Sequence, residues 1–168
     1  MSCMAQALVV LFLLASACAT TSRGPRVAEL SLWTLEGRET SAAQLPGRVL
    51  VLYLLTTGCD ACLADQNKLR ALDEQFAGRG LQIVLVAMDP DNGRVVRIFA
   101  DALGSPFPVL RAGPGLAAGS SPLGPVVRVP RVIVVDAARR VVWDREGVQA
   151  YEDLARAIGG ALDTTPDR

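Results

Sequence analysis

Two continuous apolar runs dominate the pattern of the chain and predict its central strands. Residues 48–55 include VLVLYLL, and residues 81–87 read LQIVLVA. Runs of this length, rich in β-forming residues, are typical of strands buried on both faces. Val109-Leu110 predicts a further short strand. Residues 132–135 and 141–143, on either side of a polar turn, predict a hairpin.

Helical spacing of apolar residues separates these strands. It predicts helices over residues 60–77, residues 93–103 and residues 151–162. Residues 30–40 alternate around Glu36-Gly37 and predict an N-terminal hairpin, and residues 112–125 read as a loop rich in Gly, Pro and Ser. Strands that alternate with helices, followed by a hairpin and a helix, predict an α/β sandwich around a mixed sheet.

The N-terminus has the pattern of an export signal. The apolar run over residues 4–17 would cover about 21 Å as a helix, which is short of the hydrocarbon core of about 30 Å. We therefore expect residues 1–17 to be a signal peptide, although no Lys or Arg precedes the run. The remaining chain divides into a tether over 18–28, one domain over 29–163 and a tail over 164–168.

Ala15-Ser16-Ala17-Cys18 ends that run and resembles the lipobox of bacterial lipoproteins. The resemblance implies acylation of Cys18 and a lipid anchor on the periplasmic face of the envelope. Because Ala19 follows where that family uses Asp for inner-membrane retention, we expect the outer membrane in preference to the inner. The alternative is an ordinary signal cleaved nearby, which would leave Cys18 as a free thiol.

Composition narrows the chemistry. The 168 residues carry 17 basic and 17 acidic side chains and no histidine. Zero net charge without a basic cluster argues against nucleic-acid binding. The absence of histidine excludes Ser-His-Asp and Cys-His catalysis and histidine-ligated metals. Proton transfer near neutral pH must therefore fall to a carboxylate, a thiol or an amine.

Cys59-Asp60-Ala61-Cys62 lies between the first buried strand and the helix that follows it. A helix N-terminus favours a thiolate at Cys59, and the spacing lets Cys62 close a small ring with it. Such a pair can exchange disulfides. The alternatives are half of a zinc site, a static structural disulfide and two reduced core cysteines. Only Cys3 and Cys18 would remain to complete a zinc site, so we expect no metal.

The segment over residues 29–162 resembles the TlpA/ResA-like branch of the thioredoxin superfamily. The resemblance rests on the CxxC pair and on three further segments, which are Leu30–Leu50, Leu103–Leu110 (LGSPFPVL) and Val129–Asp136 (VPRVIVVD). It implies a thioredoxin-like three-layer sandwich, a mixed sheet flanked by helices, with an N-terminal β-hairpin extension. It also implies a monomer that uses its own dithiol and no bound cofactor. A thiol–disulfide electron donor in the membrane would reduce the Cys59–Cys62 disulfide again after each reaction.

The resemblance assigns roles to individual residues. Cys59 would attack and Cys62 would resolve, while Pro130 would be cis and, with Val129, would position the substrate. Asp65 falls at the acidic position of CxxCxxE and is either a proton shuttle for Cys62 or a solvated helix residue. Tyr53 stands where thioredoxins bury an acid, and we expect it to be a core residue.

Three departures from the family pattern modify these expectations. Gly58 replaces a Trp and should leave Cys59 more open. Asp60 adds a negative charge that disfavours the Cys59 thiolate and indicates a reductant. Asn67 replaces a helix-kinking proline and predicts a straighter helix.

The sequence therefore predicts an exported thiol–disulfide oxidoreductase that reduces protein disulfides in the cell envelope. Two alternatives remain open. Thr56-Thr57-Gly58-Cys59 fits the T-x-x-C of peroxiredoxins, which would make the protein a thiol peroxidase. The other alternative is a non-enzymatic lipoprotein that keeps the fold as a binding module.

Overall fold

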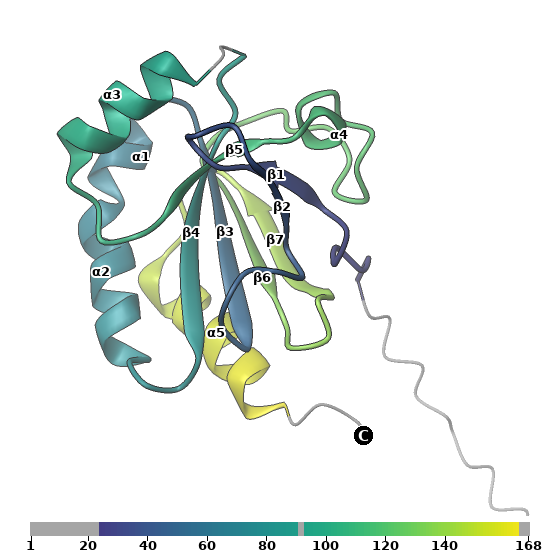
Figure 1. The fold of residues 1–168 in the computed structure, drawn as a ribbon. Coiled ribbons are helices and arrows are strands. Elements are labelled where there is room, and N and C mark those ends of the chain that lie inside the picture. Colours follow the sequence, from purple (N-terminus) through teal and green to yellow (C-terminus); the bar gives the residue numbers. More distant parts are fainter. Residues whose placement is uncertain (1–23, 91–92, 165–168) are drawn as a thin grey trace, which may run out of the picture.

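The two apolar runs form neighbouring parallel strands at the centre of a seven-stranded mixed sheet (Figure 1). The structure is a computed structural model that describes residues 24–90 and 93–164. In chain order the strands are β1 (Ser31–Trp33), β2 (Glu39–Ser41), β3 (Val49–Leu55), β4 (Leu81–Ala87), β5 (Val109–Ala112), β6 (Arg131–Val135) and β7 (Val141–Glu146). Across the sheet the order is β2-β1-β5-β4-β3-β6-β7, with β3, β4 and β5 parallel and the other neighbours antiparallel.

The helices cover the two faces of this sheet unequally. They are α1 (Asp60–Ala64), α2 (Gln66–Gln75), α3 (Arg94–Leu103), α4 (Pro114–Ala117) and α5 (Tyr151–Asp163). Side chains of α1, α2, α3 and α5 all pack into one core cluster. The crossovers β3–α1/α2–β4 and β4–α3–β5 step in the same direction, so right-handed connections place their helices on one face. The opposite face is covered by α4 and irregular segments.

Strand β3 contributes to both cores, as a continuous apolar strand must. All seven of its side chains have no exposed surface. Val49, Val51, Tyr53 and Leu55 face the helix-rich side, whereas Leu50, Leu52 and Leu54 face the side covered by α4. The prediction of a strand buried on both faces is confirmed.

Residues before β1 also contact the domain. The Val27 N–H donates to the Arg139 carbonyl at 2.8 Å, and Val141 donates to Pro25 at 3.0 Å. The side chains of Val27 and Ala28 are buried. The packed part of the chain thus begins before Glu29. The signal peptide and Cys18 lie outside the described residues.

The predicted helix over residues 60–77 is divided at Asp65 into α1 and α2, and the expectation of a straighter helix from Asn67 stays a prediction. Asp65 ends α1 and precedes α2, and its carboxylate accepts a hydrogen bond from Tyr53 in the core. The side-chain amide of Gln66 donates to the Cys62 carbonyl at 3.2 Å. The side chains of Asp65 and Gln66 therefore form hydrogen bonds at this break, two residues or fewer before Asn67, which replaces the proline of the family.

The predicted loop over residues 112–125 contains the short helix α4, which the Gly- and Pro-rich composition concealed. Pro114 occupies its first turn, where a missing N–H costs nothing. The remaining predicted strands and helices are confirmed. None of the helices within residues 24–90 and 93–164 is long and apolar enough to span a bilayer.

We predict that Leu52→Ala lowers the free energy of unfolding by about 2–5 kcal/mol, because it leaves a cavity in a strand with no exposed side chain. Urea unfolding of the disulfide form measures the loss. Ile98→Ala on α3, where the side chain is 60% exposed, is the control and should change stability by no more than about 0.5 kcal/mol. Equal losses in the two variants would contradict the packing described here.

Candidate active site

The cysteine pair lies at the carboxyl end of β3, where the buried strand meets α1. Cys59 is the N-cap of α1 and forms a disulfide with Cys62. The Cys62 N–H donates to the Cys59 Sγ at 3.1 Å. Cys59 is half-buried, while Cys62 is only 1% exposed. Cys59 is therefore the more exposed of the two cysteines.

Strand register brings Pro130 to the same edge of the sheet. β6 runs antiparallel to β3, with Leu54 opposite Arg131, so the residues before β6 lie beside the end of β3. The Val129–Pro130 peptide bond is cis, as the resemblance implied. The Gly147 N–H donates to the Pro130 carbonyl at 2.6 Å. Val129 packs against the core cluster that also receives Cys59.

The loop before Cys59 is anchored by an acidic residue from the neighbouring strand. Asp89, just after β4, accepts hydrogen bonds from the Thr57 N–H at 3.1 Å and from the Thr57 Oγ1 at 2.7 Å. Gly58 is exposed, and a Cβ placed on it would meet nothing within 4 Å. The approach to Cys59 from Gly58 is therefore open, in agreement with the expected effect of replacing a Trp.

Asp65 lies in the core below the disulfide, so its interpretation as a solvated helix residue is wrong. It is 7% exposed. Its Oδ2 accepts a hydrogen bond from the Tyr53 hydroxyl at 3.0 Å, and its Oδ1 lies 2.9 Å from the Lys68 Nζ. Lys68 also donates to the Gln149 carbonyl at 2.6 Å. Lys68 thereby connects Asp65 to the turn that follows β7. The same turn supplies the Gly147 N–H that binds the Pro130 carbonyl.

Tyr53 keeps its proton in this setting. Burial, reinforced by the nearby Asp65 charge and the hydrogen bond to it, raises the pKa of Tyr53 above its ordinary value of 10.0. The phenol therefore remains a donor to Asp65 throughout the working pH range. Tyr53 is a core residue, as expected, but it also supplies a buried polar contact to the site.

The structure brings together five of the predicted site residues, namely Cys59, Cys62, Asp65, Val129 and Pro130. The sixth, Cys18, lies outside the described residues. Asp60, the residue used to infer a reductant, is exposed on the first turn of α1. Solvent screens its charge, which weakens its effect on Cys59.

Sequence reasoning missed two residues that contact the site. Asp89 gave only a turn signal, and Lys68 was not singled out. Each makes a contact with a residue far away in the chain. The one local signal was Lys68 three residues after Asp65, a spacing that allows an ion pair on a helix.

The fold and the paired cysteines define a thioredoxin-like protein with a thiol–disulfide redox centre. The chain belongs to the Redoxin family, whose model matches residues 19–158. It resembles the TlpA/ResA-like thiol–disulfide oxidoreductases within the thioredoxin superfamily. The comparison with curated proteins gave no match.

Solved structures share the fold at low sequence identity. The thioredoxin domain of a thiol-disulfide oxidoreductase from Bacteroides vulgatus is 17% identical with a TM-score of 0.68, over 84% of this chain and 99% of that chain. A thiol:disulfide interchange protein of the thioredoxin family from Chlorobium tepidum is 22% identical with a TM-score of 0.62, over 83% and 98%. A secreted Mycobacterium tuberculosis disulfide oxidoreductase is 18% identical with a TM-score of 0.59, over 79% and 96%.

We predict that Tyr53→Phe destabilises the protein by about 1–2 kcal/mol near neutral pH, because a buried carboxylate loses a hydrogen-bond donor. The unfolded chain releases the Tyr53 proton above pH 10.0, while the folded protein retains it. The stabilisation by Tyr53 is thus present below that pH and is lost as pH rises further. The difference in stability between wild type and variant should therefore narrow above that pH.

Urea unfolding of both proteins at a series of pH values measures this difference. The two proteins share every other titrating group, so the difference between them isolates the phenol. A difference that stays constant from neutral to strongly alkaline pH would contradict the assignment.

Proposed function

We propose that this protein is an exported thiol–disulfide oxidoreductase that reduces disulfides of client proteins in the cell envelope. The observation that carries the proposal is the unequal exposure of the two cysteine residues beside the cis peptide bond. Cys59 is accessible, Cys62 is buried, and Val129-Pro130 lies at the same edge of the sheet. This arrangement suits one attacking and one resolving thiol.

The reaction starts from the reduced pair. The Cys59 thiolate attacks one sulfur of the client disulfide, which forms a mixed disulfide and releases the other client sulfur as a thiolate. The Cys62 thiolate then attacks the Cys59 sulfur, which re-forms the Cys59–Cys62 disulfide and releases the second client thiolate. The client gains two electrons and takes up two protons. In this scheme the Val129 backbone and Pro130 hold the client strand.

Asp65 is the proposed acceptor of the Cys62 proton. Only the thiolate of Cys62 can attack, so its proton must leave during the second step. Asp65 lies about one helical turn after Cys62. Tyr53 and Lys68 bind one carboxylate oxygen each and fix its position. The chain has no histidine, and Asp65 is a buried acid, whereas Asp60 on the same helix is exposed.

The proposed location of the protein in the cell rests on the expected signal peptide. In this proposal the signal over residues 1–17 exports the chain, and Cys18 carries a lipid that anchors it at the periplasmic face, in the outer membrane in preference to the inner. The protein acts as a monomer, and a thiol–disulfide donor in the membrane returns the Cys59–Cys62 pair to the dithiol. No further cofactor is required, because the dithiol carries both electrons.

We predict a reduction potential near or below that of thioredoxin, about −270 mV, for the domain without its leader. Titration with glutathione or dithiothreitol measures it, with Cys59→Ser as the control that cannot form the disulfide. A value near about −120 mV would make the protein an oxidant and would overturn the proposed direction. The absence of any reversible titration would favour the non-enzymatic alternative. Rapid peroxide consumption with a dithiol donor would favour the peroxidase.

We also predict that Asp65→Asn slows resolution of the mixed disulfide by about 10²-fold at neutral pH, because the Cys62 thiol loses its proton acceptor. The amide keeps an oxygen for Tyr53, so the fold should persist. Release of a client from the mixed disulfide, followed by quenched-flow, gives the rate. Asp60→Asn, an exposed change on α1, is the matched control. Equal rates in the two variants would contradict the proposed role.

A further inference from the structure

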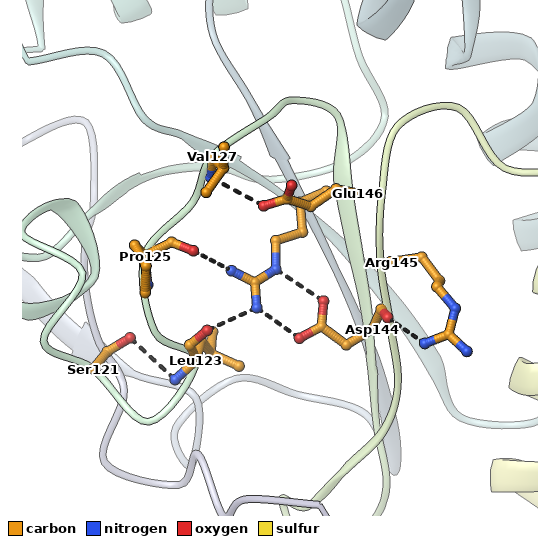
Figure 2. A network of polar contacts seen from close by, with 8 residues as sticks. Ser121, Leu123, Pro125, Val127, Asp144, Arg145 and Glu146 are labelled. Carbon is orange, nitrogen blue, oxygen red and sulfur yellow. Dashed lines mark hydrogen bonds and ion pairs between the residues drawn. The ribbon is translucent and has the colours of Figure 1, made fainter.

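Arg131, the residue directly after Pro130, is a buried cation. It is 8% exposed and faces the side of the sheet that lacks the long helices. Two nitrogens of its guanidinium donate hydrogen bonds to the Asp144 carboxylate. Nε donates to Oδ1 at 2.8 Å, and Nη2 donates to Oδ2 at 2.7 Å (Figure 2). Asp144 comes from β7, the strand next to β6. The pair therefore fixes the guanidinium in one orientation.

The remaining donors of Arg131 reach the main chain of an irregular segment. Nη2 donates to the Leu123 carbonyl at 2.7 Å, and Nη1 donates to the Pro125 carbonyl at 3.0 Å. Two residues further along, the Val127 N–H donates to the Glu146 carboxylate at 2.9 Å, and Figure 2 shows this bond beside the others. Side chains from β6 and β7 thus hold residues 123–127 by three main-chain groups.

The segment held in this way leads directly into the proposed client site. Residues 118–130 form no helix or strand, and Val127 is 82% exposed. Residues 126–129 line a cavity of about 280 Å³ together with Thr56 and Met88. The Thr56 carbonyl accepts a hydrogen bond from the Cys59 N–H at 3.1 Å. The segment and the loop that carries Cys59 therefore border the same hollow.

Stability alone does not account for this buried pair. Replacing a buried ion pair with apolar residues of similar volume is often neutral or stabilising. An apolar side chain at position 131, however, could not bind the carbonyls of Leu123 and Pro125. Besides packing, the Arg131–Asp144 pair therefore fixes the backbone path of residues 123–127.

We propose that Arg131, Asp144 and Glu146 are positioning residues for client binding. They hold residues 123–127 so that the backbone of the adjoining residues 127–129 is already arranged when a client strand arrives. Less conformational entropy is then lost on binding, which tightens the complex. This inference rests on the proposed reduction of client proteins.

The proposal separates binding from chemistry. The hydrogen bonds of these three side chains join Arg131 to Asp144 and reach residues 123–127, and none of them involves Cys59 or Cys62. Loss of the network should therefore leave the reaction of Cys59 with a small disulfide, and the reduction potential, unchanged. A protein disulfide, which has to lie along residues 127–129, should bind less tightly.

Glu146 offers the mildest test, because it is exposed and its removal should not threaten the fold. We expect Glu146→Ala to raise the KM for insulin, as a protein disulfide substrate, by about five- to tenfold with little change in kcat, since a charge-assisted hydrogen bond is lost. Glu146→Gln keeps an acceptor oxygen for Val127 and should restore most of the affinity. The rate with 5,5′-dithiobis(2-nitrobenzoate) should stay within about twofold, because no group near the cysteines changes.

Arg131 is tested with a double substitution, because a single change would leave Asp144 buried without its partner. R131M/D144L removes both charges together, and we expect it to fold and to show at least as large a rise in KM as Glu146→Ala. Asp163→Asn is the control. It breaks an exposed ion pair with Arg79 near the start of β4, at the opposite end of that strand from Asp89, and should leave KM unchanged.

Each outcome has one interpretation. An unchanged KM in both Glu146→Ala and the double variant would overturn the proposal. A parallel change in the small-disulfide rate or in the reduction potential would also overturn it, because it would indicate a general distortion of the site. Failure of the wild-type protein to reduce insulin while its disulfide still titrates would instead refute the proposed function, and this inference with it.

Discussion

The antiparallel register between β3 and β6 is the constraint on which the site depends. With Leu54 opposite Arg131, the chain that leaves β3 toward Cys59 and the chain that enters β6 from Pro130 meet at one edge of the sheet. Because successive side chains alternate between faces, a shift of one residue would turn the apolar set of β6 to the wrong side and would also separate Cys59 from Pro130. The two buried cores that fix the register therefore also fix the distance between the cysteine pair and the cis peptide bond before Pro130.

Buried polar contacts then join the parts that this register brings together. Lys68 binds both Asp65 on the cysteine-bearing helix and the Gln149 carbonyl in the turn after β7. That turn also supplies the Gly147 N–H that binds the Pro130 carbonyl. Tyr53, protonated because of burial, completes the set from β3. The Asp65 carboxylate is thus held in a fixed position between a phenol and an ammonium group.

The sequence was informative wherever the signal was local. Apolar runs predicted β3 and β4, the CxxC spacing and its place between strand and helix predicted the disulfide site, and the family resemblance predicted the cis bond before Pro130. The break at Asp65, the contact of Asp89 with Thr57 and the bonds of Arg131 could not be predicted in this way. Each depends on which distant residues the fold brings within hydrogen-bond distance. An Asp on a helix or an Arg in a strand has the same local pattern whether it faces water or a buried partner.

The way in which Arg131 holds the segment before Pro130 has a consequence for how the protein can change over time. Its guanidinium binds the carbonyls of Leu123 and Pro125, and every residue type offers a carbonyl at these points. Substitutions at the exposed positions Val127 and Arg128 can therefore alter the surface of this segment while the path of the backbone stays the same. Related chains could therefore present different side chains on this segment through changes at these exposed positions alone, with the cysteine pair and both cores left intact.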